Sequence, residues 1–328
     1  MLSVARPLVG LERPPTAGPK EACALSAGPR VRAERARQRV AFVLLGLLSA
    51  AILLPAVLIV ALVAVKGAPA VNWEFVATMP RDGMKAGGIL PAIYGSALLV
   101  TVTMLLSLPV GVLGAVYLSE YARRGPLVRL IRIAILNLAG VPSIIYGLFG
   151  VGVFVMVVLP AMMDAMHVAK QGHSPACLLA GAATMALLVL PMVITTTEEA
   201  LRQVPQHLRD ASLALGATKW QTVRRVVLRN ALPGILTGVM LSVGRAAGET
   251  APILLTGAAF YIPAMARPGA ALLQPFMALP YHLFATSTQL PDAPESLKWG
   301  TAFVLLMFVL GFNATGIVLR ARLRRSRG

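Results

Sequence analysis

Residues 233–260 read PGILTGVMLSVGRAAGETAPILLTGAAF, and this stretch decides what kind of protein the chain is. It is long and apolar enough to cross a bilayer, because a spanning helix needs roughly 20 predominantly apolar residues. It nevertheless contains two charged side chains, Arg245 and Glu249. An Arg at the centre of a bilayer costs about 2.5–3.5 kcal/mol on insertion scales, so the pair requires an explanation.

The composition of the whole chain indicates a membrane protein. Of its 328 residues, 57% are hydrophobic and 13% are charged, whereas a soluble domain carries about 25% charged residues. Six apolar segments are long enough to span a bilayer. They are residues 41–65, 91–118, 133–159, 177–197, 233–260 and 299–319. We therefore predict an all-α integral membrane protein with six transmembrane helices.

The net charge of +17 is compatible with nucleic-acid binding or with membrane topology. If the N-terminus is cytoplasmic, 23 of the 30 Lys and Arg residues lie in inner segments and six lie in outer ones. The inner segments are residues 1–40, 119–132, 198–232 and 320–328. This asymmetry is the positive-inside bias of membrane proteins. It predicts cytoplasmic termini and contact with membrane lipid, and it excludes a nucleic-acid partner.

The segments outside the spans suggest a simple organisation. Residues 1–38 are rich in Pro, Gly, Ala and Arg without periodicity, which predicts a disordered basic cytoplasmic tail. Residues 39–320 would form one six-span domain, and residues 321–328 a second basic tail. The aromatic residues of the outer segments 66–90 and 261–300 predict either an interfacial belt or a docking surface for a partner.

Several predicted spans contain proline. These prolines are Pro55, Pro109, Pro142, Pro191 and Pro252. An interior proline costs about 3 kcal/mol in an exposed helix, but membranes tolerate it where neighbours or cavity water satisfy the freed carbonyl. Two interpretations remain open: ordinary kinks in a packed bundle, or breaks that shape a pathway.

The fifth span carries a small and polar stripe on one helical face, within roughly 80° of the helical wheel. The stripe consists of Gly238, Ser242, Arg245, Glu249, Pro252 and Thr256. It should face the bundle interior or a water-filled cavity, because exposure to lipid is unfavourable. The Arg245–Glu249 pair is either an internal ion pair that fixes packing or an anion contact. The predicted pathway residues are Arg245, Glu249, Ser242 and Thr256.

Residues 198–232 are too regularly patterned for a linker. Leu201, Val204 and Leu208 recur at helical spacing. Gly216 supplies a helix stop, and Thr218 with Gln221 has the spacing of a capping box that starts a new helix. We expect a helix, a sharp turn and a second helix near the inner surface. The segment either rests on anionic headgroups or is a socket for a cytoplasmic partner.

This inner segment resembles the EAA loop of ABC importer permeases, in which Glu-Ala-Ala is followed by a Gly. The chain has Asp210-Ala211-Ser212 and then Gly216. It departs from the pattern in Asp for Glu, Ser for the second Ala, and Arg229 for a later Pro, which leaves the end of the following helix open. The resemblance implies that the loop's short helix fits a groove on an ATPase subunit. The implied coupling residues are Asp210, Ala211, Ser212, Gly216, Ala217 and Thr218.

Further stretches, among them GVPSIIYGLFGVGVF at residues 140–154 and GETAP at 248–252, resemble PstA-type permeases of phosphate-specific ABC importers. The resemblance covers most of residues 90–260. It implies the type I importer permease (MetI-like) fold in a bacterial inner membrane. The Arg–Glu motif of that family falls on Arg245 and Glu249.

The resemblance also implies a complex with a PstC-type permease, two PstB-type ATP-binding subunits and an extracytoplasmic PstS-type phosphate-binding protein. ATP and Mg²⁺ would be bound by the ATP-binding subunits, because the chain has no Walker A pattern and is not itself expected to be an enzyme. It shows no catalytic residue pair, cofactor motif or metal-ligand spacing. The four scattered histidines, His167, His173, His207 and His282, are expected to be incidental loop or surface residues.

Two alternative functions remain open. The chain could be a permease for another oxyanion, such as sulfate, molybdate or phosphonate. It could instead be an ATP-independent channel or carrier in which the Arg245–Glu249 pair gates the pathway or relays protons. The second alternative leaves the patterned inner segment without a role.

Overall fold

The structure is a computed structural model that describes residues 29–84, 86–123, 125–167, 173–262, 270–290 and 292–325. The predicted disorder of residues 1–28 therefore lies outside the described residues. By compactness the chain divides into two units, residues 1–61 and residues 62–328. The described part of the first unit consists of helix alone, and the second unit contains all other elements.

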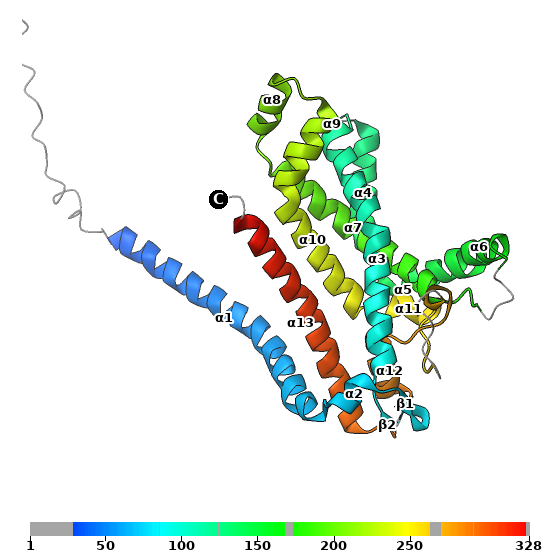
Figure 1. Ribbon diagram of the computed structural model, residues 1–328. Coiled ribbons are helices and arrows are strands. Elements are labelled where there is room, and N and C mark those ends of the chain that lie inside the picture. Colours follow the sequence, from blue (N-terminus) through cyan, green and yellow to red (C-terminus); the bar gives the residue numbers. More distant parts are fainter. Residues whose placement is uncertain are drawn as a thin grey trace, which may run out of the picture. The chain divides into compact units, whose positions relative to one another are not determined.

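The described residues are almost entirely helical (Figure 1). The α-helices are α1 (Pro29–Gly67), α2 (Trp73–Ala77), α3 (Leu90–Val116), α4 (Pro126–Ala139), α5 (Ser143–Gly150), α6 (Leu159–Ala165), α7 (Leu178–Arg202), α8 (Gln206–Ala214), α9 (Lys219–Thr222), α10 (Leu228–Gly248), α11 (Ala251–Thr256), α12 (Leu279–Thr288) and α13 (Glu295–Arg325). Wider π-helical turns form η3 (Tyr117–Tyr121), η4 (Val151–Val158) and η5 (Val223–Val227). Short 3₁₀ turns form η1 (Ala68–Ala70), η2 (Asp82–Met84) and η6 (Ala271–Leu273), and β1 (Pro80–Arg81) pairs antiparallel with β2 (Ala86–Gly87).

Six helical stretches are long and apolar enough to cross a membrane. They are Arg37–Ala70, Leu90–Tyr121, Ser143–Ala165, Leu178–Arg202, Lys219–Gly248 and Glu295–Arg322. The prediction of an all-α protein with six transmembrane helices is thereby confirmed.

The third span begins later than the sequence predicted. Helix α4 ends at Ala139 and α5 begins at Ser143, so residues 133–139 belong to a separate helix. Pro142 between them has an extended conformation, with φ −55° and ψ 138°. A proline disfavours helical geometry at the residue before it, which explains why an apolar run becomes two helices here. The span then continues through η4 and α6 to Ala165.

The predicted tails are partly helical. Helix α1 begins at Pro29, so the prediction of disorder was wrong for residues 29–38. Proline fits the first turn of a helix, and the Ala, Glu, Arg and Gln residues that follow it are strong helix formers. At the other end α13 continues to Arg325, well into the predicted tail 321–328.

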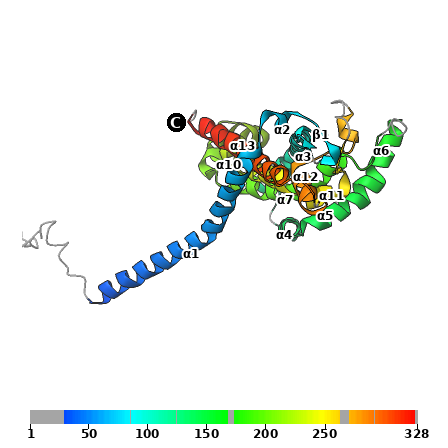
Figure 2. The same cartoon turned by 90° about the horizontal axis from the view of Figure 1, so that it is seen from below.

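Helix α7 forms the centre of the second unit, where it contacts α3, α4, α5, α10 and α11 (Figures 1 and 2). Its side chains contribute Leu178, Met185 and Leu188 to the largest apolar cluster. Helix α10 approaches α7 closely at two glycines. A Cβ at Gly238 would lie 2.0 Å from Thr196 Oγ1, and one at Gly234 would lie 2.6 Å from Ala200 Cβ. The two helices therefore have little freedom to slide past each other.

The outer segments are more ordered than a surface belt requires. Asn72 caps α2 by accepting a hydrogen bond from the Phe75 N–H (2.7 Å), and Phe75 is buried. Helix α12 occupies much of the predicted loop 261–300, with its Leu279 N–H donating to Ser96 Oγ on α3 (2.7 Å). These contacts fix the outer segments on α3 and α13.

His282 on α12 is not the incidental surface residue that the sequence predicted. Its side chain lies in the interior, with only 2% of the residue exposed, and neither ring nitrogen has a hydrogen-bond partner in the described structure. Burial without a counter-ion lowers the pKa of this imidazole to about 4. The wrong prediction came from treating residues 261–300 as a loop, because a loop rarely buries a histidine completely.

Candidate functional site

The fifth span is not one continuous helix. Helix α10 ends at Gly248, and Glu249 is extended, with φ −83° and ψ 130°. Helix α11 starts at Ala251 with Pro252 in its first turn. Because proline lacks an N–H, it cannot continue the helical hydrogen-bond ladder, but it is tolerated in a first turn. The predicted single stripe to Thr256 was therefore wrong beyond Glu249.

Arg245 and Glu249 nevertheless form the predicted pair. Arg245 Nε lies 3.4 Å from Glu249 Oε1. The two side chains are 28% and 27% exposed, so neither charge is sealed in the interior. The pair is thus a single loose contact at the end of α10, where either charge could exchange its partner for another ion.

Ser242 and Thr256, the other two predicted pathway residues, are completely buried. The Ser242 hydroxyl donates to the Gly238 carbonyl and the Thr256 hydroxyl donates to the Pro252 carbonyl, both at 2.9 Å. The Thr256 methyl group also lies against Gly150 on α5. These side chains pack helices together and do not reach an accessible surface here, and their assignment to a pathway stays a prediction.

The helix that follows the break after α10 packs against the helix that follows a second break, that between α4 and α5. A Cβ at Gly147 on α5 would lie 3.0 Å from the Ala251 carbonyl oxygen. The Tyr146 hydroxyl spans the other break by donating to the Leu138 carbonyl (2.8 Å). Substrate sites of membrane transporters commonly form at such discontinuous helices. The sequence signalled both breaks through Pro142 and Pro252, but it did not indicate that the helices following them, α5 and α11, pack together.

The inner segment folds as a helix, a sharp turn and a helix, as the sequence predicted. Gly216 adopts φ 82° and stops α8, with its N–H donating to the Leu213 carbonyl (2.9 Å). The Ala217 N–H donates to the Ser212 carbonyl (3.2 Å), which completes a Schellman motif. Thr218 and Gln221 form the predicted capping box at the start of α9. The two arms are joined by the Ser212 and Thr222 hydroxyls, 2.9 Å apart.

The tip of this segment exposes apolar side chains. Leu215 is 90% exposed, and Leu213 and Trp220 beside it are also exposed. The predicted coupling residues Asp210 and Ala211 lie on the same exposed helix, where Asp210 accepts a hydrogen bond from Gln206 (3.1 Å). An exposed apolar tip with a rigid backbone is typical of a surface that binds another protein.

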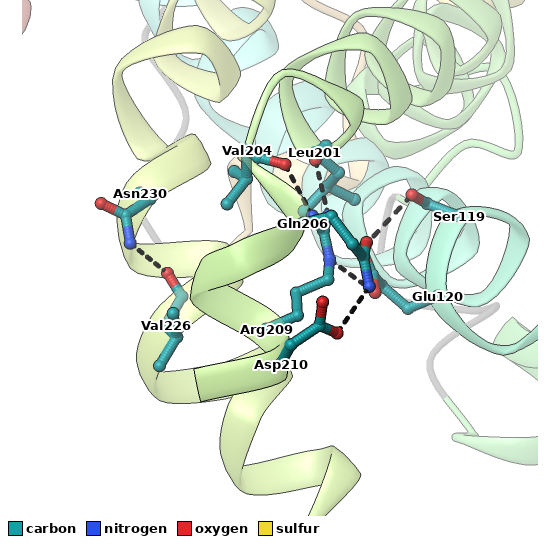
Figure 3. Close-up of polar contacts among 9 residues, drawn as sticks. All are labelled: Ser119, Glu120, Leu201, Val204, Gln206, Arg209, Asp210, Val226 and Asn230. Carbon is teal, nitrogen blue, oxygen red and sulfur yellow. Dashed lines mark hydrogen bonds and ion pairs between the residues drawn. The ribbon is translucent and has the colours of Figure 1, made fainter. Parts of the chain in front are cut away.

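Sequence reasoning missed the residue that holds α8 in place, which is Arg209 (Figure 3). Its Nη2 lies 2.8 Å from Glu120 Oε1 and its Nε lies 3.3 Å from Glu120 Oε2. It also donates to the carbonyls of Val204 (2.6 Å) and Leu201 (2.9 Å). The two charged residues are 89 positions apart, so no local spacing could have paired them.

A second ionic cluster ties α4 to its neighbours. Glu198 on α7 pairs with Arg132 on α4 (2.7 Å) and with Arg202 one turn later on α7 (2.6 Å). Arg132 also donates to the Leu118 carbonyl of η3 (2.9 Å). Charged side chains thus join α4 to the ends of two spans, those formed by α3 with η3 and by α7.

Comparisons with known proteins agree with this architecture. Residues 107–327 match the family described as "Binding-protein-dependent transport system inner membrane component". The chain is 34% identical to the phosphate transport system permease protein PstA of Pasteurella multocida over 76% of its own length and 81% of that protein. It is 37% identical to the protein of the same name from Mycobacterium leprae, over 72% and 71% of the two chains.

A solved structure has the same fold. A chain of the bacterial ABC transporter involved in import of the acidic polysaccharide alginate superposes with a TM-score of 0.59. The match covers 88% of this chain and 96% of that one at 14% identity, so it supports the fold alone.

Proposed function

The chain belongs to the family of binding-protein-dependent transport system inner membrane components, and on this premise we propose that it is the permease subunit of an ATP-driven phosphate importer. It would form the translocation pathway with a partner permease in a bacterial inner membrane. The names of the relatives supply the substrate class. The observation that carries the assignment to particular residues is the accessible Arg245–Glu249 pair at the end of α10.

Arg245 is suited to phosphate because a guanidinium is always charged and presents a planar fork of donors. Phosphate at neutral pH carries one to two negative charges and needs such a donor when it leaves water. In the absence of phosphate, Glu249 compensates the charge of Arg245 through one 3.4 Å contact. An arriving anion would displace this carboxylate, and Glu249 could accept a hydrogen bond from a protonated phosphate oxygen.

The helix–turn–helix from α8 to α9 would dock on an ATP-binding subunit. The exposed apolar tip around Leu215 supports this role, because a water-exposed cluster of this kind favours burial against a partner. The Lys and Arg distribution supports placing the tip and both termini in the cytoplasm. ATP and Mg²⁺ would be bound by the partner subunits, and an outer binding protein would deliver phosphate.

The test is uptake of radiolabelled phosphate by proteoliposomes that contain the chain with its permease, ATP-binding and binding-protein partners. We expect Arg245→Gln to reduce ATP-dependent uptake by at least tenfold at equal protein abundance. Arg229→Gln is the matched control, because Arg229 is an exposed Arg on the same helix, remote from the break. If the Arg245→Gln variant took up phosphate at the wild-type rate, Arg245 would have a packing role only.

Competition separates phosphate from the other oxyanions. Uptake of labelled phosphate should resist a hundredfold excess of sulfate or molybdate and should fall when unlabelled phosphate is added. A complex that assembles, hydrolyses ATP and moves sulfate instead of phosphate would overturn the substrate. Uptake without ATP would favour the channel or carrier alternative.

A further inference from the structure

Helix α8 has few contacts with the rest of the protein. None of its nine residues is fully buried. Three residues are partly buried, namely Leu208, Arg209 and Ser212, and all others are exposed. Leu208 packs at the margin of the apolar cluster formed by the inner ends of the spans. Ser212 bonds to Thr222, which is on the next helix of the same loop.

The contact between α8 and the spans α3 and α7 therefore depends mainly on Arg209, whereas Ser212 holds α8 to Thr222 at the start of the fifth span. Its guanidinium donates four hydrogen bonds, two to the Glu120 carboxylate and one each to the Val204 and Leu201 carbonyls (Figure 3). Arg209 and Glu120 are 13% and 10% exposed, so solvent weakens this pair far less than a surface pair. The two carbonyls lie where α7 ends; the Leu201 carbonyl also accepts from the Val204 N–H (3.2 Å), whereas the bond that the structure gives to the Val204 carbonyl comes from Arg209.

These bonds connect α8 to two spans at once. Glu120 lies in η3, the continuation of α3, and Leu201 lies in the last turn of α7. Helix α7 in turn contacts α10 at Gly234 and Gly238, where no side chain separates the helices. Helix α10 ends at the Arg245–Glu249 pair. Helix α8 is joined to α10 directly through α9 and η5, and Arg209 adds a second route, through α7, to the helix that carries the proposed anion contact.

We propose that Arg209 is a positioning residue that fastens α8 to the ends of α3 and α7, so that movement of α8 displaces both spans together. The inference rests on the proposed function, because it assigns to α8 the movement that an ATP-binding subunit would impose. Without Arg209, the loop between Gln203 and Thr218 would bend and absorb the displacement. The coupling residues of the exposed tip would then still bind the partner but would not move the spans.

The chemistry of the site requires the guanidinium itself. Lysine keeps the charge but has a single nitrogen, which cannot reach a carboxylate and two separate carbonyls in this geometry. Arg209→Lys therefore tests the fork of donors, and Arg209→Gln tests fork and charge together. Glu120→Gln keeps the shape of the side chain but removes the counter-charge and replaces one of the two acceptor oxygens with an NH2 group.

The experiment measures ATP hydrolysis and phosphate uptake in the same proteoliposomes, with loaded binding protein added. We expect Arg209→Gln and Arg209→Lys to keep ATP hydrolysis within about threefold of wild type while phosphate moved per ATP falls at least fivefold. The matched control is Arg202→Gln, which removes a 58% exposed Arg whose carboxylate partner is on its own helix. The control should retain wild-type stoichiometry.

A double-mutant cycle adds a readout that simple destabilisation would not produce. If the pair acts as a unit, Arg209→Gln combined with Glu120→Gln should lower the stoichiometry no further than the worse single variant. Wild-type stoichiometry in Arg209→Gln, or a loss equal to that of Arg202→Gln, would overturn the proposal. The proposal would also be overturned if the fold-loss of phosphate moved per ATP in the double variant equalled the product of the losses in the two single variants.

A distance measurement keeps the proposal testable if a variant assembles poorly. Spin labels at Gln203 and Ala214, both exposed, would report the position of α8 relative to the end of α7 in a Cys23→Ser background. The remaining cysteine, Cys177, is buried. We expect one narrow distribution of the distance between the labels when Arg209 is present, and a broader one in the Arg209→Lys variant. The same distribution in both proteins would contradict the proposal. This measurement does not depend on the substrate, whereas failure of wild type to move phosphate would overturn only the proposed function.

Discussion

Two Arg–carboxylate pairs in this protein are built differently. Arg245 and Glu249 meet at one 3.4 Å contact and are about one quarter exposed. Arg209 and Glu120 meet at 2.8 and 3.3 Å and are nearly buried, and two backbone carbonyls complete the coordination of the guanidinium. The first geometry suits a pair that must open for an anion, and the second suits a pair that must hold while the protein moves.

The comparison teaches that the residue types alone do not distinguish a binding pair from a structural one. What differs is the number of additional donors and acceptors satisfied, and the access of water. Four measurements would sharpen or break this distinction.

The largest effect is expected for Arg209→Leu. Removing one partner of a nearly buried pair leaves the Glu120 carboxylate without its counter-charge and removes a donor from the Val204 carbonyl, which should reduce the free energy of unfolding by about 3–5 kcal/mol. Thermal unfolding in detergent would measure the loss. Arg202→Leu removes an Arg that is 58% exposed and leaves Glu198 paired with Arg132, so it should cost no more than about 1 kcal/mol. If both variants lost the same free energy of unfolding, the Arg209–Glu120 pair would be no more important for stability than an exposed Arg.

Acidification should cause the next largest loss of stability, because His282 is a buried ionisable group without a counter-ion. The pKa of His282 is about 4 in the folded protein, against about 6.5 when exposed. Because the unfolded chain binds the proton first, the folded state loses stability as the pH falls from about 6.5 to 4, by about 3 kcal/mol in total.

His282→Leu, which fills the space without a titratable group, should remove this part of the pH dependence. Unfolding midpoints of the two proteins would be compared at pH 7 and pH 4.5. If their difference did not change between the two pH values, His282 would not be a buried neutral histidine.

Gly238→Ala should cost about 1–3 kcal/mol, because the added methyl would overlap Thr196 where α7 and α10 touch. Gly244→Ala is the control on the same helix, since its nearest atom in another element, Asn313 Oδ1, is 3.6 Å away. Thermal unfolding of both variants would compare the two positions. A neutral Gly238→Ala would show that the two helices are free to separate, and it would weaken the route between the ion pairs.

The smallest effect on stability is expected for Glu249→Gln. A single partly exposed contact contributes at most about 1 kcal/mol, so the unfolding midpoint should scarcely change. Its effect should appear in function, as altered phosphate uptake at unchanged protein abundance. If Glu249→Gln lost as much stability as Arg209→Leu, the Arg245–Glu249 pair would serve mainly to stabilise the fold.

The sequence predicted the local features of the site well. The Arg245–Glu249 pair, the helix stop at Gly216 and the capping box at Thr218 depend on residues within four positions of one another, and all three are present. It could not predict how far a side chain is buried by helices that are remote in the chain. Ser242 and Thr256 share a polar character with Arg245, yet neighbouring helices bury them completely.

By itself, the sequence determined the class of the protein, its six spans and the chemistry available at residues 245 and 249. Hydrophobic length, charge distribution and short-range spacing suffice for these, because each acts within one segment. Only the tertiary structure decided that α5 and α11, which follow the two helix breaks, pack together and that Arg209 finds Glu120 across 89 positions. It also decided that His282 is buried. These outcomes follow from which helices pack together, and packing depends on the complementary shapes of segments that are remote in the chain.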